Sequence, residues 1–230
     1  DSIKIAEEVK KAGKNNGFHP IFKASLDKAN RTSGKAFRTI GMKKALYQLY
    51  ETAKEVKIDV ITDVHEPRQV KEVEQFVDYL QIPAFLARQT DLIYACAKSG
   101  KPTVIKKPQF ISHESAKFIE EKYYDFGGTK MYICERGNSF GYSDLIVDVT
   151  SIQRLKESCE KSGVILDCTH SLQRPNRGSS TKGNAKYIET MVRFGSVMGA
   201  DGLFIETHPE PSKSPSDSEN MLPLHLLNDV

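Results

Sequence analysis

Basic side chains end or follow several short apolar runs of the sequence. Lys23 and Lys28 lie at or just after one such run, Lys106 and Lys107 at the end of another, and Arg136 after a third. Most lysines are solvated surface charges, but a lysine that directly ends a buried strand faces the end of the sheet. Cations from different strands that converge there would form a pocket for a phosphate or a small polyanion.

Histidines and carboxylates form a second candidate set at similar positions. Its members are Asp63, His65, His170, Glu206 and Asp217. Imidazole nitrogens and carboxylate oxygens bind divalent ions such as Zn, Fe or Mn, so one histidine and two carboxylates could hold an ion with one further ligand. Each of these side chains could equally be hydrogen-bonded in a loop. The residues alone leave both interpretations open.

The cysteines indicate neither a disulfide framework nor a zinc knuckle. Cys96, Cys134, Cys159 and Cys168 are far apart in the sequence and form no C-x-x-C pair. Free thiols are typical of a reducing compartment, so we expect a cytoplasmic protein. We expect Cys134 and Cys168 to be core residues.

Composition excludes several classes of protein. The 230 residues include 33 basic and 30 acidic side chains, a net charge of +3, and 39% are hydrophobic. The mean hydropathy is -0.45, and no long apolar run is present. These values exclude a disordered chain and a membrane span. Because the basic residues are spread among acids, we expect neither a nucleic-acid nor a membrane partner.

Short apolar runs alternate with longer segments of helical periodicity, which is typical of βα units and a parallel sheet. The seven predicted strands cover 20–23, 60–63, 79–81, 103–106, 131–134, 164–167 and 203–206. The predicted helices cover 3–11, 42–56, 70–76, 91–98, 116–123 and 185–194. The stretch 209–219 is rich in Pro, Ser and charge and predicts a loop.

Two α/β folds place ligands at the carboxyl ends of parallel strands, the (β/α)8 TIM barrel and the doubly wound sheet. The G-x-G-x-x-G signature of a Rossmann fold is absent, and the polar residues are distributed over many strand ends, so we favour the barrel. A barrel of this type closes with eight strands. We therefore expect one domain over 1–230 whose first strand precedes Asp1, truncated at the N-terminus and also at the C-terminus.

Eight stretches of the sequence resemble the 3-deoxy-D-manno-octulosonate 8-phosphate synthase family. They are FKASLDKANRTS at 22–33, ITDVHEP at 61–67, QIPAFLARQTDL at 81–92, KKPQF at 106–110, ERG at 135–137, FGY at 140–142, THS at 169–171 and ETHP at 206–209. The match runs in order along nearly the whole chain, and several blocks are long and uncommon. Chance similarity does not explain it.

The resemblance implies a (β/α)8 barrel that forms a homotetramer. It also implies an enzyme that condenses phosphoenolpyruvate with arabinose 5-phosphate to give an eight-carbon sugar phosphate and inorganic phosphate, with no organic cofactor. In the family, this sugar supplies lipopolysaccharide in Gram-negative bacteria.

The family motifs assign roles to individual residues. The resemblance implies that the phosphoenolpyruvate pocket is lined by Lys23, Lys28, Gln81, Ala84, Phe85, Lys106 and Arg136. Asn30, Arg31 and Thr32 would bind arabinose 5-phosphate, and Thr32 replaces the usual Ser. Arg88 resembles a residue that reaches the sugar phosphate of a neighbouring subunit.

The charges of the pocket residues indicate which part of the substrate each one binds. Lys106 with Arg136 can take the phosphate of phosphoenolpyruvate, while Lys28 steadies its carboxylate end. Asp63 and His65 are candidates for handling the proton of the water that adds during the reaction. The candidate catalytic residues are thus Lys28, Asp63, His65 and Lys106.

The family has a metal-dependent branch and a metal-independent branch, which differ by Cys or Asn on the first strand. That position lies outside this chain, so a fourth ligand would too. The other ligands match His170, Glu206 and Asp217, which occur in both branches. The ERG motif at 135–137 resembles the metal-dependent branch more closely.

Two loops depart from the family pattern. Arg-Thr-Ile-Gly stands at 38–41 where the family has Arg-Gly-Pro/His-Gly, and Gly-Asn-Ala-Lys at 183–186 corresponds to a Gly-Gly-x-Arg run, so Lys186 could substitute for that arginine.

Two alternatives to the family activity stay open. The first is a related synthase that uses erythrose 4-phosphate, although its usual Lys-Pro-Arg is replaced here at 28–31. The second is a phosphosugar-binding barrel without catalytic activity.

Overall fold

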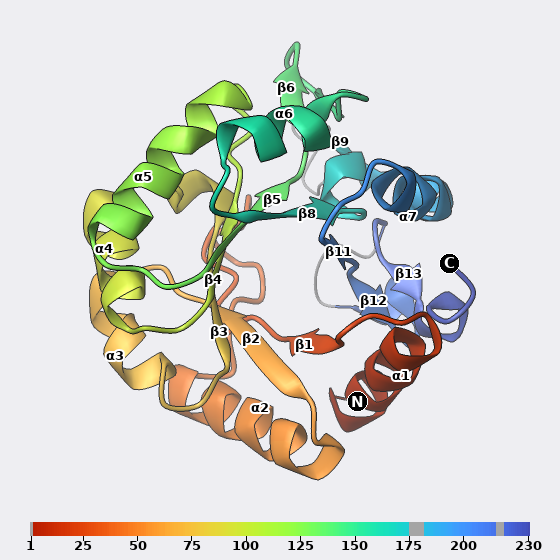
Figure 1. Cartoon of the computed structure of the whole chain (residues 1–230). Coiled ribbons are helices and arrows are strands. Elements are labelled where there is room, and N and C mark those ends of the chain that lie inside the picture. Colours follow the sequence, from red (N-terminus) through yellow and green to blue (C-terminus); the bar gives the residue numbers. More distant parts are fainter. Residues whose placement is uncertain (1, 175–181, 215–218) are drawn as a thin grey trace.

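Seven parallel strands form one curled sheet, with helices along its outer side (Figure 1). The computed structural model describes residues 2–174, 182–214 and 219–230. The strands of this sheet are β1 (Ile21–Lys23), β2 (Asp59–Asp63), β3 (Tyr79–Ile82), β4 (Thr103–Lys106), β5 (Met131–Glu135), β8 (Gly163–Asp167) and β11 (Gly202–Phe204). The α-helices are α1 (Ser2–Asn15), α2 (Met42–Val56), α3 (Pro67–Val73), α4 (Thr90–Lys98), α5 (Lys117–Asp125), α6 (Ser151–Ser158) and α7 (Ile188–Val197).

The loops contain shorter strands and 3-10 turns. The two-stranded pairs are β6 (Asn138–Phe140) with β7 (Asp144–Ile146), β9 (Gln173–Arg174) with β10 (Lys182–Gly183), and β12 (Thr207–His208) with β13 (Leu222–Pro223). Single 3-10 turns are η1 (Ala84–Leu86), η2 (Glu114–Ala116), η3 (His170–Leu172), η4 (Ala185–Tyr187), η5 (Pro211–Lys213) and η6 (Leu224–Leu226).

The order of strands in space identifies the fold class. The order is β1-β2-β3-β4-β5-β8-β11, so the strands of the sheet follow one another in chain order, whereas a doubly wound sheet reverses its order at a switch point. Within the described residues the two ends of this order, β1 and β11, are not paired with each other. The sheet is therefore an open barrel of βα units, consistent with the predicted (β/α)8 class.

All seven predicted strands are present, and most bounds differ by only a residue or two. The last strand differs most, because β11 ends at Phe204 and leaves Glu206 in the segment that follows. Helix α6 was not predicted. Only Ile152 and Leu155 are buried apolar residues along it, too few to produce a visible helical period. His208, expected in a loop, lies in β12.

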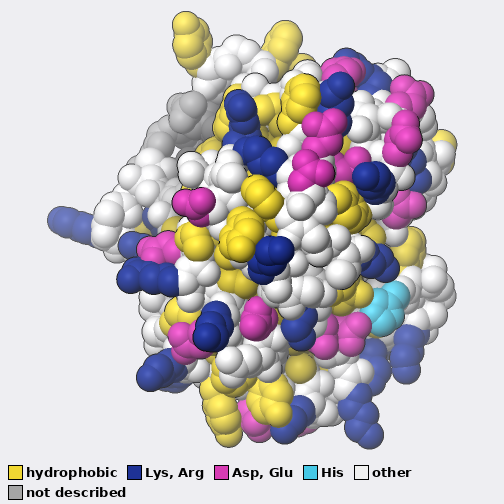
Figure 2. All heavy atoms as spheres, turned by 60° about the vertical axis from the view of Figure 1, so that its left-hand side comes forward, with side chains coloured by type: hydrophobic (Ala, Val, Ile, Leu, Met, Phe, Trp, Pro, Cys, Tyr) yellow, Lys and Arg dark blue, Asp and Glu magenta, His cyan; other side chains and the backbone are white. Residues whose placement is uncertain are grey.

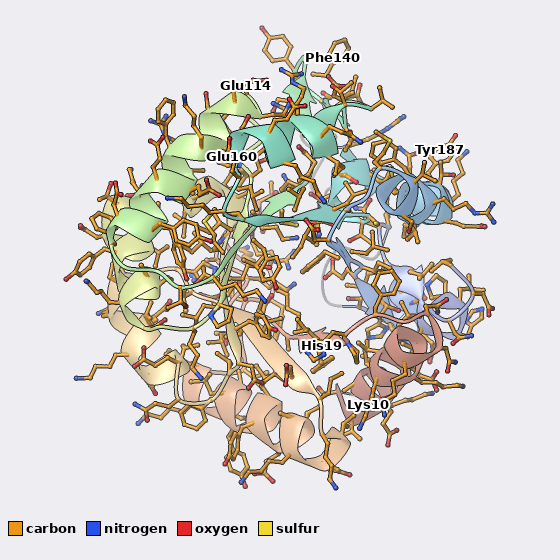
Figure 3. The ribbon with its side chains drawn as sticks, in the orientation of Figure 1. Lys10, His19, Glu114, Phe140, Glu160 and Tyr187 are labelled. Atoms are coloured by element: carbon orange, nitrogen blue, oxygen red, sulfur yellow. The ribbon has the colours of Figure 1, made fainter. Side chains whose placement is uncertain are left out.

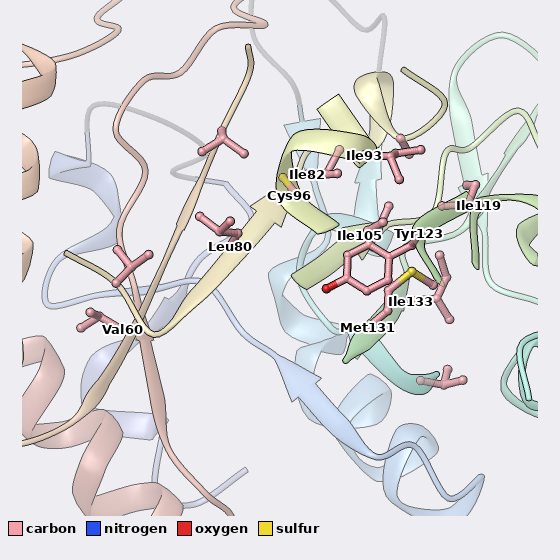
Figure 4. Packing of buried hydrophobic residues seen from close by; sticks show 14 of the residues in the cluster. Val60, Leu80, Ile82, Ile93, Cys96, Ile105, Ile119, Tyr123, Met131 and Ile133 are labelled. Carbon is pink, nitrogen blue, oxygen red and sulfur yellow. The ribbon is translucent and has the colours of Figure 1, made fainter. Parts of the chain in front are cut away.

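The side chains of the sheet alternate between two apolar clusters. Leu80, Ile82, Ile105 and Ile133 face outward and pack against the helices, as in the close view of Figure 4. A smaller cluster contains the intervening residues Ile61, Val104 and Cys134, with Ile21, Tyr79, Tyr132, Ile165 and Phe204 packed against it. Because successive strand residues point to opposite faces, this second cluster fills the barrel interior.

Helix α3 illustrates how the local sequence fixes a loop at the barrel mouth. Pro67 occupies its first turn, and Glu66 and Gln69 form a capping box. The side chain of Gln69 accepts a hydrogen bond from the N–H of His65 at 2.8 Å. The start of this helix therefore holds the backbone that carries His65 after β2.

The C-terminal segment lies beside the first helix, α1. Asn15 at the end of α1 donates a hydrogen bond to Asn228 over 2.7 Å, and Figure 1 places the C-terminal segment beside α1. All four cysteines are buried and unpaired, and the burial of Cys134 and Cys168 was expected.

Charged side chains of both signs are interspersed on the molecular face that Figure 2 presents. Glu114, Phe140 and Tyr187 lie on the periphery, outside the ring of strands (Figure 3). Among the described residues, none of the helices combines the length and the apolar character that a membrane crossing requires.

Candidate active site

A cavity of about 1820 Å³ occupies the mouth and interior of the barrel and extends toward α1. Nearly all of the predicted site residues line it: Lys23, Lys28, Asn30, Arg31, Thr32, Asp63, His65, Gln81, Ala84, Phe85, Lys106, Arg136, His170 and Glu206. Arg88 is exposed and does not line this cavity. Asp217 lies outside the described residues.

Strand periodicity explains why polar side chains collect at this mouth. Asp63 follows inward-facing Ile61 by two residues, and Lys106 follows inward-facing Val104 by the same step. Arg136 continues the inward positions of β5 beyond Cys134. A two-residue period thus turns Asp63, Lys106 and Arg136 into the barrel, directly above the interior apolar cluster.

Lys106 and Asp167 form a buried ion pair across the barrel. The Nζ of Lys106 donates to Oδ2 of Asp167 at 2.5 Å, from the ends of β4 and β8. The same Nζ lies 3.3 Å from the centre of the Phe204 ring. Burial opposes ionisation of Asp167, but His170 and Lys106 outweigh it and hold the pKa of this carboxyl well below its usual range.

Lys23, Asp63 and His65 make a second ionic group on the neighbouring strands. Lys23 Nζ lies 3.8 Å from Asp63 Oδ1, and His65 Nε2 lies 3.3 Å from Asp63 Oδ2. Burial raises the pKa of Asp63, but Lys23 and His65 overcome this effect and bring it below the ordinary value. Burial also lowers the pKa of the Lys23 ammonium. Asp63 is therefore an ionised acceptor beside an imidazole.

His170 lies between two carboxylates. Its Nδ1 is 2.9 Å from Asp167 Oδ2 and its Nε2 is 3.1 Å from Glu206 Oε2. Burial lowers the pKa of His170, but Asp167 and then Glu206 raise it above the usual value. Burial raises the pKa of Glu206, but His170 outweighs this effect and lowers the pKa to about 2. Lys28 completes the group, with its Nζ 3.6 Å from Glu206 Oε1.

Arg136 is held by Gln173, whose Oε1 accepts a hydrogen bond from Nη2 at 2.9 Å. Gln81 and Gln109 also line the cavity, and each has a buried Oε1 without a hydrogen-bond partner among the residues that the structure covers. Buried polar atoms are nearly always paired in folded proteins. These two amides therefore mark places where a polar ligand can bind.

The loop after β1 carries the residues predicted to hold the sugar phosphate. The N–H of Lys28 donates to the carbonyl of Arg38 at 3.0 Å, and the guanidinium of Arg38 pairs with Asp27. These contacts close the loop through Arg38, the position at which the segment 38–41 keeps the expected arginine. Asn30 and Thr32 are exposed at the cavity rim. Phe85 is also at the rim and is 57% exposed.

Lys186 does not take the place of the expected arginine in the cavity. Its Nζ lies 4.9 Å from the centre of the Tyr187 ring, and it is not among the cavity residues.

Among the cavity residues that the sequence did not assign to the site are Asp167, Gln109 and Gln173. Asp167 had a visible signal, because it ends an apolar strand in the same way as Lys106. Gln109 lies in a turn and Gln173 in the short strand β9, and neither ends an apolar run of the sequence.

The cavity alternates cations and anions, and this arrangement suits an anionic substrate. The lysines and Arg136 are fixed by partners before any ligand binds, so a phosphate meets preorganised donors. The Asp63–His65 and Asp167–His170–Glu206 groups can accept or hold protons beside it. Such a site can bind a phosphorylated carboxylic acid and exchange a proton with a water.

Known proteins resemble the chain over nearly its whole length. Residues 1–230 match the family model described as the DAHP synthetase I family. A 2-dehydro-3-deoxyphosphooctonate aldolase of Paraburkholderia xenovorans (strain LB400) is 42% identical over 217 residues, covering 91% of this chain and 76% of the relative. The protein of that name from Cupriavidus taiwanensis is 41% identical over 236 residues, covering 100% and 81%. That from Shewanella sp. (strain MR-4) is 42% identical over 227 residues, covering 98% and 80%.

Proposed function

The chain belongs to the DAHP synthetase I family, and from this membership we propose that it condenses phosphoenolpyruvate with D-arabinose 5-phosphate. The products are 3-deoxy-D-manno-octulosonate 8-phosphate and inorganic phosphate. Relatives named 2-dehydro-3-deoxyphosphooctonate aldolase, at 41 to 42% identity, support this substrate pair over erythrose 4-phosphate. The product class places the enzyme in the synthesis of the sugar acid that lipopolysaccharide contains.

One observation carries the proposal: the cations that end separate strands converge on one cavity. Lys23, Lys106 and Arg136 come from three different strands and line the same mouth. Phosphoenolpyruvate brings a phosphate and a carboxylate, and burying both requires several fixed positive charges. Lys106 and Arg136 take the phosphate, and Lys28 lies on the side of Glu206 where the carboxylate end is expected.

The reaction forms one carbon–carbon bond and one carbon–oxygen bond to water, and it breaks the carbon–oxygen bond to the phosphate. The C3 of phosphoenolpyruvate attacks the aldehyde carbon of the sugar, whose oxygen takes a proton. Water adds to C2 and loses one proton, and phosphate then leaves with its bridging oxygen as the new hydroxyl at C2 gives up its remaining proton and becomes the keto group. Holding both substrates in line supplies much of the rate, because the bimolecular steps become intramolecular.

Asp63 and His65 fit the proton transfer from the water. The carboxylate stays ionised beside Lys23, and it lies 3.3 Å from His65 Nε2, which orients the imidazole at the mouth. An imidazole held by a carboxylate is a common general base. We assign the proton of the attacking water to this pair.

His170 and Glu206 fit a divalent metal site. His170 Nε2 and Glu206 Oε2 are 3.1 Å apart, which two ligands of one ion can satisfy, and Asp167 on Nδ1 orients the ring as outer carboxylates do in metal sites. Asp217, which lies outside the described residues, would be the third ligand. A Zn, Fe or Mn ion bound there would neutralise and orient substrate oxygens as a Lewis acid.

Arg88 supports the proposal that the active unit is a homotetramer. It is exposed, and its carbonyl oxygen accepts a hydrogen bond from Lys122 Nζ at 3.4 Å. A long cation beside the cavity wall at Phe85 can reach the mouth of a neighbouring copy. Light scattering gives the oligomeric state directly.

Phosphate release from phosphoenolpyruvate tests the proposed reaction. Arabinose 5-phosphate should accelerate release more than erythrose 4-phosphate does. Lys106→Met should lower the rate by about a hundredfold or more, because a preorganised charge on the leaving group is removed. Lys71→Gln, on the exposed side of α3, is the matched control and should behave as the unsubstituted protein.

The outcomes separate the alternatives. Faster release with erythrose 4-phosphate would assign the acceptor to the other synthase activity. Binding of both substrates without release under either condition would indicate a phosphosugar-binding barrel.

A further inference from the structure

A further ionic cluster, separate from those that line the cavity, is buried on the outer side of the barrel, behind the cavity wall. Lys107 Nζ lies 3.5 Å from Glu135 Oε1, and His113 Nε2 lies 2.9 Å from Glu135 Oε2. The side chains of Lys107 and Glu135 are fully buried, and that of His113 is 7% exposed. None of the three lines the cavity. We call these residues the outer cluster.

The outer cluster is adjacent in sequence to the anion-binding cations. Lys107 follows Lys106, and Glu135 precedes Arg136. Because successive residues of a strand point to opposite faces, turning Lys106 and Arg136 into the barrel turns Lys107 and Glu135 out of it. The N–H of Lys107 also donates to the carbonyl of Cys134 at 2.8 Å, so the register of β4 with β5 extends to the cluster.

Hydrogen bonds from the outer cluster tie two cavity loops together. Glu135 Oε1 accepts the N–H of Gly137, which closes the backbone around Arg136. Lys107 Nζ donates to Asn138 Oδ1 at 2.7 Å, and Asn138 Nδ2 donates to the carbonyl of Ile111 at 2.7 Å.

A backbone contact extends this connection to the cavity. The N–H of Ser139 donates to the carbonyl of Gln109 at 3.0 Å. The segment that presents Gln109 is thus bound to the segment that presents Arg136.

Stability alone does not account for this cluster. Burial disfavours both charges, yet Glu135 keeps a pKa below its usual value, stabilised first by His113 and then by Lys107, while burial lowers the pKa of Lys107. Buried ion pairs contribute little net stability compared with apolar packing of the same volume. A role in fixing geometry explains the burial better.

We propose that Lys107, Glu135 and His113 are positioning residues that aim Lys106, Arg136 and Gln109 at the phosphate of phosphoenolpyruvate. They touch no substrate and act through their sequence neighbours. Removing the charge of Glu135 leaves Lys107 buried beside a neutral group and loosens the loops on both sides of Arg136. The effect should fall on the phosphoenolpyruvate end of the cavity, because the arabinose 5-phosphate residues come from the loop after β1.

Steady-state kinetics of Glu135→Gln test this assignment, which rests on the proposed function. We expect kcat/KM for phosphoenolpyruvate to fall by about a hundredfold, as for a small misplacement of reacting groups, while KM for arabinose 5-phosphate changes less than about twofold. Glu120→Gln is the matched control, a buried glutamate that lies away from the cavity and accepts the N–H of Lys161 at 3.0 Å. Equal changes in both KM values, or a loss that follows the unfolding midpoint alone, would overturn the proposal.

His113 provides a second test that does not depend on turnover. Calorimetric titration with phosphoenolpyruvate, and with inorganic phosphate as a smaller probe, measures the phosphate site in the absence of catalysis. His113→Leu should weaken both ligands by about tenfold or more, and His113→Gln, which keeps a donor toward Glu135, should recover most of that affinity.

The binding measurements also keep the two proposals apart. Equal phosphate affinity in the unsubstituted protein, His113→Leu and His113→Gln would contradict the positioning role. Failure of the unsubstituted protein to turn over would count against the proposed reaction only, since ligand binding still decides the role of the cluster.

Discussion

Asp167 bridges the phosphate side and the histidine side of the cavity. Its Oδ2 accepts from Lys106 at 2.5 Å and lies 2.9 Å from Nδ1 of His170. One buried carboxylate therefore holds both the proposed anion-binding lysine and the proposed metal-binding histidine. Any change at Asp167 should affect both functions of the site together.

Asp167→Asn should destabilise the protein and impair catalysis. Removing one charge of a buried pair leaves the Lys106 ammonium uncompensated, and we expect a loss of about 3 kcal/mol in unfolding free energy. Urea unfolding at pH 7 measures it. Glu189→Gln, which breaks the exposed pair with Arg193, is the control and should cost about 0.5 kcal/mol or less. A similar small loss for both variants would mean that the buried Lys106–Asp167 pair stabilises the protein no more than an exposed ion pair does.

Sequence patterns predicted the strands because their information is local. A run such as Thr103 to Lys106 is apolar, short and ends in a charge, and both its structure and its cavity-facing last residue follow from that pattern. The family resemblance then placed Asn30 and Phe85, whose local sequence signals nothing specific. Both residues line the predicted cavity.

The pairing between strand ends could not be predicted in this way. Lys106 and Asp167 are 61 residues apart, and their contact exists only because β4, β5 and β8 are neighbours in the sheet. The outer cluster was missed for the same reason, since the sequence grouped Lys107 with Lys106 as a cation of the pocket, whereas Lys107 is buried outside the cavity lining. Tertiary neighbours, absent from any local pattern, decide these roles.

Metal removal should lower the rate of phosphate release. We expect the purified protein to retain a divalent ion of the Zn, Fe or Mn class, chelation to reduce activity, and re-addition to restore it. His170→Gln should lower the metal content found by elemental analysis about tenfold or more, because an imidazole ligand is lost. His225→Gln, an exposed histidine of η6, is the control. Full activity in protein shown to be free of metal would assign the chain to the metal-independent branch.

The stability contribution of Asp63 should depend on pH in a defined direction. Its pKa in the folded protein is below the unfolded value of about 3.9, so its stabilisation is complete above about pH 5 and is lost as the pH falls toward the folded pKa. The difference in unfolding free energy between the unsubstituted protein and Asp63→Asn should therefore shrink between pH 5 and about pH 2.

Urea unfolding midpoints measured across this range test the Asp63 prediction. Asp125→Asn, at the exposed end of α5, is the control and should give a difference that stays small at every pH. A difference for Asp63→Asn that grew as the pH fell would reverse the assigned sign.

Gly137 should be intolerant of a side chain because of its backbone conformation and its neighbours. Its φ is +85°, and an added Cβ would lie 3.3 Å from the carbonyl oxygen of Ile146. We expect Gly137→Ala to lower the unfolding free energy by about 1 kcal/mol or more. It should also raise the KM for phosphoenolpyruvate, because the N–H of Gly137 binds Glu135 and sets the backbone of Arg136.

Gly34→Ala is the control, because it replaces a glycine at a position that requires no special backbone conformation. Gly34 has no positive φ, and an added Cβ there meets nothing within 4 Å, so this variant should be as stable as the unsubstituted protein or slightly more stable. Urea unfolding and phosphoenolpyruvate kinetics on both variants make the comparison. If Gly137→Ala matched Gly34→Ala in both measurements, the turn after β5 would be free to relax, and Arg136 would not depend on its geometry.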